Sequence, residues 1–185
     1  MLAAATIPAF AGSPPDDRSK GPQPPALRKS PEFTLTEING KQTLLSSYRG
    51  KVVVLAFVYT TCPHCQAFSM VLEKLYKDLG PKGFQPIDVA WNQEAKTPGV
   101  VEAFAHQFGV TFPVFESDYD PIMSFMQFSV MDRPVVPLEV VIDKRGYIRA
   151  QAPSQGDPNL QDEGKLRIMI ETLLKEPSAR AAKSR

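Results

Sequence analysis

The chain contains two cysteines, Cys62 and Cys65, and only Pro63 and His64 separate them. Two thiols at this spacing can close into a disulfide and reopen by thiol–disulfide exchange. They follow the apolar run 52–59, which is typical of a strand buried on both faces, and they begin a helical pattern. A helix N-terminus carries partial positive charge and favours thiolate over thiol. The spacing therefore predicts a redox site in which Cys62 attacks and Cys65 resolves.

Three other uses of the cysteine pair compete with this interpretation. Structural zinc needs four protein ligands and catalytic zinc needs three plus water, whereas only His64 and His106 could join the cysteines. A purely structural disulfide would close a small ring and remove little entropy from the unfolded chain. Two inert core cysteines are the third alternative, but Pro63 and His64 are poor core filler. We therefore predict redox chemistry with no cofactor and no metal site.

The composition limits the classes of protein to consider. With 185 residues, of which 43% are hydrophobic and 22% charged, the chain suits one globular domain with a sizeable core. Its net charge of +1 and the lack of a dense basic face argue against nucleic acid as a partner. No stretch approaches the roughly 20 apolar residues of a membrane helix, so we expect no membrane span in this chain.

The two ends differ in composition from the rest of the chain. We expect a leader remnant and proline-rich linker over 1–30, a folded domain over 31–175 and a polar tail over 176–185. The A-x-A triplet at 9–11 resembles a signal-peptidase site, but the basic region of a secretory signal is missing. The true start could lie upstream or have been trimmed, and an Ala-rich disordered end is the alternative. We favour export, which also suits a redox-active pair.

The hydrophobic periodicity predicts an alternation of strands and helices. We expect two hairpins, one over 33–36 and 41–45 with a tight turn at 39–40, and one over 138–142 and 147–151. Between them we expect strands over 52–59, 84–90 and 112–115. The expected helices span 63–79, 97–108, 121–128 and 161–175, so that helices follow strands along the chain. Such alternation implies parallel strands, and the last hairpin adds antiparallel ones. The expected fold class is α/β, with a mixed sheet flanked by helices and an extra N-terminal β-hairpin.

Several different short motifs lie along this order of strands and helices. They are NGK at 39–41, YRGK at 48–51, the CxxC pair, FGV at 108–110 followed by FPV at 112–114, and Pro137 six residues before Asp143 in a hairpin closed by Gly146. In this combination the chain resembles thioredoxin-fold proteins over about residues 32–175. It is most similar to the TlpA/ResA branch of thiol-disulfide oxidoreductases, within the redoxin (AhpC/TSA) superfamily.

The resemblance implies roles for further residues. Pro137 would be cis and face the CxxC pair, and Val136 would offer its backbone to an extended substrate peptide. The dipeptide formed by Pro63 and His64 matches that of the oxidant DsbA, so a charged imidazole would favour the dithiol form and tune the site toward oxidation. The alternative for His64 is a solvent-exposed residue without such a role. Ala56 departs from the pattern, since it replaces the buried acid that thioredoxin uses in proton transfer.

The resemblance also implies an activity and partners. The expected activity is thiol-disulfide exchange between the Cys62–Cys65 couple and protein thiols or disulfides, with the direction of electron flow left open. Apocytochrome c or another exported protein would be the client, and a second protein would recycle the couple. The expected location is the bacterial periplasm, or the outer side of the inner membrane on a membrane tether. We expect a monomer with an antioxidant or oxidoreductase role.

Two other classes share this fold. Sco copper chaperones have a similar phrase over 57–63, but they use CxxxC and a later histidine, whereas no histidine follows His106 here. Peroxiredoxins place their cysteine in a P-x-x-x-T-x-x-C pattern, and here Leu55 and Tyr59 occupy the proline and threonine positions. A non-catalytic binding module would leave the CxxC pair unexplained.

Overall fold

The centre of the molecule is a pair of parallel strands, β3 (Val52–Val58) and β4 (Phe84–Ala90), in which every residue is buried. The computed structural model describes residues 27–178, and in them these strands belong to one mixed seven-stranded sheet. A strand covered on both faces needs apolar side chains at successive positions, which explains the continuous run Val52–Val58.

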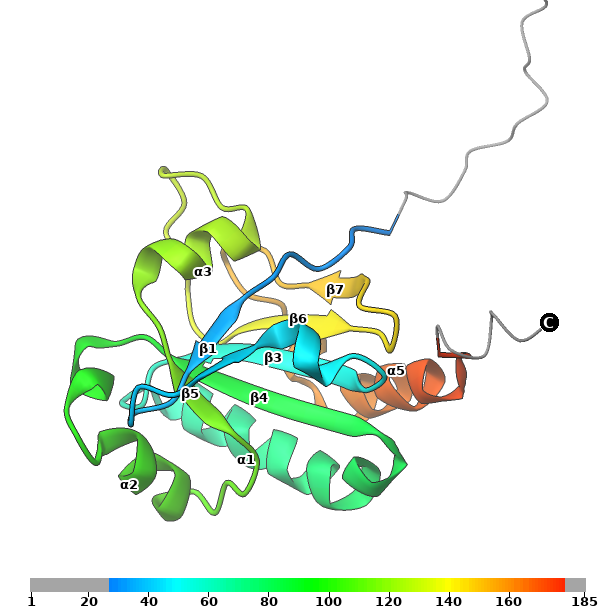
Figure 1. Cartoon of the computed structure of the whole chain (residues 1–185), viewed down its shortest axis with the longest axis horizontal. Coiled ribbons are helices and arrows are strands. Elements are labelled where there is room, and N and C mark those ends of the chain that lie inside the picture. The colour runs from blue at the N-terminus through cyan, green and yellow to red at the C-terminus, as the bar shows by residue number, and fades with distance from the viewer. Residues whose placement is uncertain (1–26, 179–185) are drawn as a thin grey trace, which may run out of the picture.

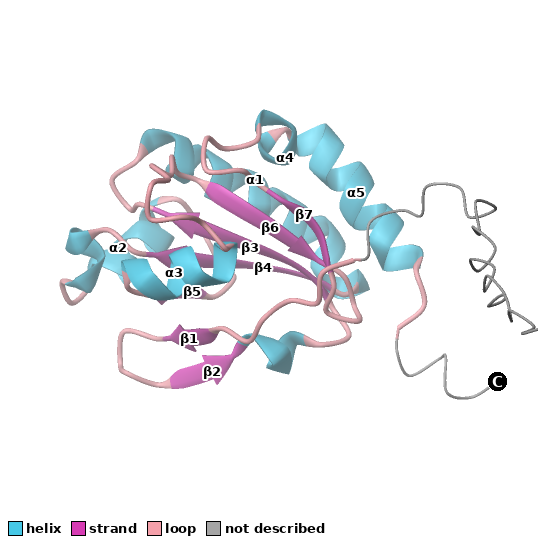
Figure 2. Ribbon diagram, turned by 90° about the horizontal axis from the view of Figure 1, so that it is seen from above, coloured by secondary structure: helices cyan, strands magenta, loops and turns pink. Residues whose placement is uncertain are grey.

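The strand order is β2-β1-β5-β4-β3-β6-β7. The flanking strands are β1 (Thr34–Thr36), β2 (Gln42–Leu44), β5 (Val114–Glu116), β6 (Leu138–Ile142) and β7 (Ile148–Gln151). β5 is parallel to β4, and β6 is antiparallel to β3. The β1–β2 hairpin lies at one edge of the sheet and the β6–β7 hairpin at the other (Figure 2).

Helices cover both faces of the sheet (Figure 1). α1 (Pro63–Leu79) and α5 (Glu163–Lys175) lie side by side on one face and are joined by ion pairs such as Lys74–Glu163 at 2.8 Å. α3 (Tyr119–Met126) covers the other face, where the ring of Phe125 lies 5.9 Å from that of Phe57. The remaining helices are α2 (Val100–Gln107), α4 (Pro158–Gln161) and the 3₁₀ turns η1 (Leu45–Tyr48), η2 (Gly80–Lys82) and η3 (Gln93–Lys96).

The predicted fold class is confirmed, since the sheet is mixed, helices flank it, and an N-terminal hairpin extends it. Several boundaries differ from the expected ones by a few residues, and three of these differences have a clear physical reason. The first hairpin has a longer connection than a two-residue turn, because the ladder already ends at Thr36–Gln42. The helix expected from 97 begins only at 100, since Gly99 has a φ of +84° that interrupts a right-handed helix. The last helix begins at 163, where Asp162 caps it by accepting the amide of Lys165.

The expected leader and most of the expected linker, residues 1–26, lie outside the described residues, as does the end of the tail, 179–185. No helix within 27–178 is both long and apolar enough to cross a membrane.

The last residues of the expected linker pair with the β6–β7 hairpin. Lys29 forms an antiparallel bridge with Tyr147. The amide of Ser30 donates to the carbonyl of Gly146 at 2.9 Å, and the amide of Ile148 donates to the carbonyl of Arg28 at 2.8 Å. Backbone contact with the domain therefore begins before residue 31.

Candidate functional site

The two cysteines lie at the start of α1, which follows the loop after β3. Cys62 is the N-cap residue of α1, and Pro63 is the first helical residue, where a missing amide hydrogen costs nothing. Cys62 is half-buried, Cys65 is fully buried, and both are free thiols. The amide of Tyr59 donates to the sulfur of Cys65 at 3.4 Å. The first sulfur can therefore meet another molecule, whereas the second lies inside the protein.

The two thiols have different electrostatic surroundings. Burial raises the pKa of the Cys65 thiol well above its usual range, the amide of Tyr59 lowers it, and Cys62 and Asp88 raise it further. A buried thiol of this kind stays protonated until a neighbour takes its proton. The pair is thus asymmetric in access, and its buried member, Cys65, is a weaker acid than an ordinary cysteine.

Polar contacts fix the loop that leads into the cysteines. The amide of Thr60 donates to Oδ1 of Asn92 at 3.0 Å, and the Asn92 side chain donates back to Oγ1 of Thr60 at 2.9 Å. From α1, the side chain of Gln66 donates to the carbonyl of Thr60 at 2.9 Å. The loop is therefore held from both the β4 end and the first turn of α1.

The predicted tuning residues, Pro63 and His64, are both exposed at the start of α1. The imidazole lies within the CxxC pair, at the end of the helix where the backbone amides have no carbonyl partner.

The predicted substrate-binding residues lie at the same edge of the sheet. The Val136–Pro137 peptide bond is cis, as the resemblance implies. The register pairs Phe57 with Leu138, so Pro137 lies beside Val58, just before the loop that carries Cys62. Pro137 is buried and Val136 is half-buried. The topology thus brings the proline and the cysteines together.

An open groove of about 500 Å³ lies next to Cys62 on the side of β4. Its lining includes Thr61, Glu94 and three neighbouring aromatic residues whose rings are tilted against one another. The ring of Trp91 lies 4.7 Å from that of Tyr59 and 5.6 Å from that of Tyr119. The sequence reasoning missed this groove, because its residues come from segments that only the fold brings together.

Two buried acids in the sheet were also missed. Asp88 in β4 and Glu139 in β6 are both fully buried, within strands that read as apolar. Burial raises the pKa of Asp88 to about 7, while a hydrogen bond from Ser69 lowers it. Burial raises the pKa of Glu139 to about 8. A carboxylate in the middle of an apolar strand was the available signal, because such residues are rarely buried without a partner.

Within residues 27–178, no three or more His, Cys, Asp or Glu side chains form a group that could hold a metal ion.

Comparison with known proteins gives a family. The sequence profile of the AhpC/TSA family matches residues 27–151. The chain is 30% identical over 120 residues to the thiol-disulfide oxidoreductase ResA of Geobacillus kaustophilus, covering 65% of this chain and 64% of that protein. It is 33% identical over 113 residues to "Probable glutathione peroxidase 8-B" of Xenopus laevis, covering 55% of this chain and 54% of that protein. The chain thus spans about half to two thirds of the length of these curated relatives.

Solved structures give the same fold. A thiol:disulfide interchange protein of the thioredoxin family from Chlorobium tepidum superimposes with a TM-score of 0.67 at 19% identity, covering 82% of this chain and 99% of that chain. The thioredoxin domain of a thiol-disulfide oxidoreductase from Bacteroides vulgatus gives a TM-score of 0.62 at 17% identity, covering 80% of this chain and 96% of that chain. The fold is therefore thioredoxin-like.

Proposed function

Because the chain belongs to the AhpC/TSA family and has a thioredoxin-like fold, we propose that it is a thiol-disulfide oxidoreductase acting through Cys62 and Cys65. One observation carries the proposal. Cys62, whose thiol is half-exposed, occupies the N-cap position of α1, and the buried thiol of Cys65 lies one helical turn further along the same helix. A sulfur that reaches a client, with a second sulfur held behind it, is the arrangement that disulfide exchange requires.

The exchange proceeds in two steps. The Cys62 thiolate attacks a client disulfide, which forms a mixed disulfide and releases one client sulfur as a thiolate. The sulfur of Cys65, once deprotonated, attacks the sulfur of Cys62, which closes the internal disulfide and releases the second client sulfur. An oxidant works by the reverse sequence, starting with attack of a client thiolate on the Cys62–Cys65 disulfide.

The client would be an extended segment of another protein, which Val136 and Pro137 contact on one side of the cysteines. Two facts support this part of the proposal. The cis bond lies beside the end of β3, and the groove lined by Tyr59 and Trp91 opens on the other side of Cys62. Exposure of His64 next to the attacking sulfur supports a tuning role for its imidazole.

The finer assignments belong to the same proposal. The clients would be exported proteins such as apocytochrome c, a second redox protein would recycle the couple, and the enzyme would work outside the cytoplasm as a monomer. Similarity to the thiol-disulfide oxidoreductase ResA supports the class of reaction. The net charge of +1 fits a protein client better than nucleic acid.

The test uses the two cysteines separately. We expect Cys62→Ser to reduce insulin no faster than dithiothreitol alone, because the attacking sulfur is gone. Cys65→Ser should accumulate a mixed disulfide with the client, seen by mass spectrometry without reductant. A circular dichroism spectrum like that of the wild type controls for folding. Unchanged insulin reduction by Cys62→Ser would contradict the proposal.

The same preparations separate the alternatives. Rapid consumption of hydrogen peroxide with a thiol reductant would favour a peroxidase, which the similarity to the Xenopus protein makes worth testing. Tight binding of one copper(I) ion by the reduced protein would favour a copper carrier. The reduction potential measured against glutathione then decides whether the couple donates or withdraws electrons.

A further inference from the structure

Two acids flank one small residue on the face of the sheet that α1 and α5 cover. Ala56 in β3 is in register with Asp88 on one side and with Glu139 on the other. Residues in register on neighbouring strands point to the same face of a sheet. Asp88 faces α1, because its Oδ2 accepts a hydrogen bond of 2.6 Å from the hydroxyl of Ser69.

The second oxygen of Asp88 has no partner. Within residues 27–178, no donor lies within hydrogen-bonding distance of Oδ1, although Asp88 is fully buried. No cation acts on its pKa either, since only burial and Ser69 do so. An unpaired buried oxygen costs free energy, and a carboxyl group can relieve that cost by binding a proton.

The neighbouring elements place little else beside this carboxyl. β3 and β5 present Ala56 and Val114 in register with it. From α1, Glu73 is engaged elsewhere, because it accepts from Thr111 and pairs with Lys77. Cys65 is a titratable residue of α1 on whose pKa Asp88 acts.

Cys65 lies on the same side of α1 as Ser69, one turn closer to the active-site edge. Residues four apart on a helix have Cβ atoms only about 5–6 Å apart. Asp88 is also one of the groups that raise the pKa of Cys65. Because Cys65 is 0% exposed, no solvent base reaches its thiol directly. Asp88 and Cys65 thus share a dry site in which two negative charges cannot coexist.

We propose that Asp88 is the proton acceptor for Cys65 when the internal disulfide closes. This rests on the proposed function and adds a residue to it. In this step Cys65 loses its proton to the Asp88 carboxylate, and its sulfur forms a bond to the sulfur of Cys62. The bond between Cys62 and the client sulfur breaks, and the client leaves as a thiolate. On reduction the proton returns from Asp88 to the Cys65 sulfur.

The pKa of Asp88 suits this task. An acceptor works best when its pKa lies near the working pH, so that it is ionised often enough to take a proton and basic enough to hold it. Burial raises the pKa of Asp88 to about 7, and the hydrogen bond from Ser69 keeps it from rising further. Ser69 is therefore a positioning residue in this scheme.

Glu139 offers a matched control. It is equally buried, lies on the opposite flank of Ala56, and also has a raised pKa. However, the groups that act on it besides burial are its own backbone, Gln161 and Asp157, and none of them is in α1. A buried acid in the sheet without a role at the cysteines should behave like Glu139.

The experiment follows the two sulfurs in turn. The reduced protein is mixed with one equivalent of dithiobis-nitrobenzoate, which releases one coloured thiolate when Cys62 forms the mixed disulfide and a second when Cys65 displaces it. Stopped-flow absorbance resolves the two phases. At pH 7 we expect Asp88→Asn to slow the second phase by about a hundredfold and to leave the first unchanged. Glu139→Gln should leave both phases unchanged.

The direction of the effect separates the proposal from simple repulsion. If Asp88 acted only as a negative charge, Asp88→Asn would ease ionisation of Cys65 and speed the second phase. An accelerated or unchanged second phase, or an equal slowing in Glu139→Gln, would overturn the proposal. If wild-type protein released only one coloured thiolate, the proposed function itself would fail.

The pH dependence of the rate of the second phase tests the proposal with another variant, Ser69→Ala. We expect the wild-type second phase to accelerate as the pH rises through about 7, where Asp88 ionises. Ser69→Ala removes the hydrogen bond that lowers the pKa of Asp88, so this rise should move to higher pH. A profile that stays in place would contradict the role of Ser69 and, with it, Asp88 as the titrating acceptor.

Discussion

Two regions of the same sheet each bury an aspartate, and the pKa of the carboxyl group shifts in opposite directions in the two regions. Asp143 follows β6 at the end of the sheet remote from the cysteines, and Asp88 lies in the middle of β4. Both are almost completely buried, at 3% and 0% exposure. Nevertheless, the pKa of Asp143 is lowered and that of Asp88 is raised. Burial alone therefore does not decide whether an acid is charged.

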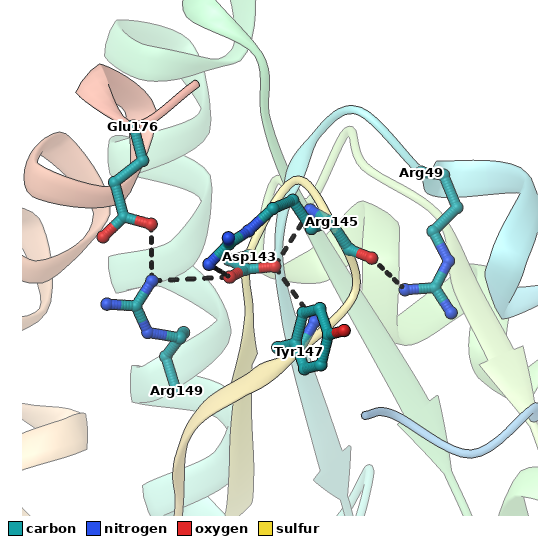
Figure 3. A network of polar contacts seen from close by, with 6 residues as sticks. All are labelled: Arg49, Asp143, Arg145, Tyr147, Arg149 and Glu176. Carbon is teal, nitrogen blue, oxygen red and sulfur yellow. Dashed lines mark hydrogen bonds and ion pairs between the residues drawn. The ribbon is translucent and has the colours of Figure 1, made fainter. Parts of the chain in front are cut away.

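The hydrogen-bonding and ion-pair partners of each carboxyl group decide whether it is charged. Oδ1 of Asp143 accepts the amides of Arg145 and Tyr147, both at 2.9 Å, and Oδ2 pairs with Arg149 at 3.4 Å (Figure 3). Burial by itself would raise the pKa of Asp143, but these amides and guanidinium groups lower it by more. Asp88 has only the hydroxyl of Ser69. One acid is thus a fixed anion that shapes a hairpin, and the other can exchange a proton.

The largest expected effect comes from removing the fixed anion. Asp143→Ala should lower the free energy of unfolding by about 3–5 kcal/mol, because it strands two amides and a partly buried arginine. Urea denaturation measures this. Glu176→Ala is the control, since it removes only the partly exposed partner of Arg149 and should cost about 1 kcal/mol or less. Equal losses in the two variants would show that the Asp143 contacts are no stronger than a surface ion pair.

The pH dependence of stability should separate the two acids. The folded pKa of Asp88, about 7, lies above its unfolded value of about 3.9, so the folded state holds the proton more tightly. Its contribution to stability is therefore complete below pH 4 and is lost as the pH rises to about 7, by up to about 1.4 kcal/mol per pH unit. For Asp143 the sign is opposite, and its contribution is lost as the pH falls below about 4.

Urea denaturation of the reduced protein between pH 4 and pH 8 tests the contribution of Asp88, and extending it below pH 4 tests that of Asp143. The unfolding free energy of the wild type should decrease with rising pH, and Asp88→Asn should flatten the part below pH 7. Glu139→Gln should flatten the part that extends to about pH 8. Parallel curves for the wild type and Asp88→Asn would contradict the raised pKa.

The smallest effect concerns the turn that aims the amides at Asp143. Gly146 has a φ of +86°, so Gly146→Ala should cost about 1–2 kcal/mol for the left-handed backbone. The new Cβ would also displace Arg49, whose guanidinium donates to the carbonyl of Arg145. Gly156→Ala, at a φ of +80° and with only an ordinary contact of 3.7 Å from its Cβ to Nε2 of Gln161, should show the backbone cost alone. If both variants lose the same stability, the Arg49 contact contributes nothing to the hairpin.

Much of the frame could be predicted from the sequence because its signals are local. The apolar run Val52–Val58, the helix begun by Pro63 and the final hairpin all lie where periodicity and turn residues indicate. The short helix α4 was missed, since Pro158–Gln161 is too brief to show a period. The cysteines and Pro137 were predicted as one site through a motif, and the topology places them at one edge.

The remaining parts of the site depend on register, which no local pattern shows. Asn92 holds Thr60 only because β3 and β4 end at the same edge of the sheet. Asp88 and Glu139 are 51 residues apart in the sequence, and they flank Ala56 only once the three strands are paired. Their signal in the sequence was a conflict, a charge within an apolar strand, and such conflicts mark places where tertiary structure overrides local preference.

The pairing of Lys29 with Tyr147 has a consequence for where the chain enters the domain. This bridge pairs the chain with the turn of the β6–β7 hairpin, next to the beginning of β3, whereas the cysteines follow the other end of β3. A force along the backbone before Lys29 would act first on this hairpin and not on the edge of the sheet that holds the cysteines. The chain thus enters the domain at one end of the sheet, and the cysteines lie at the other.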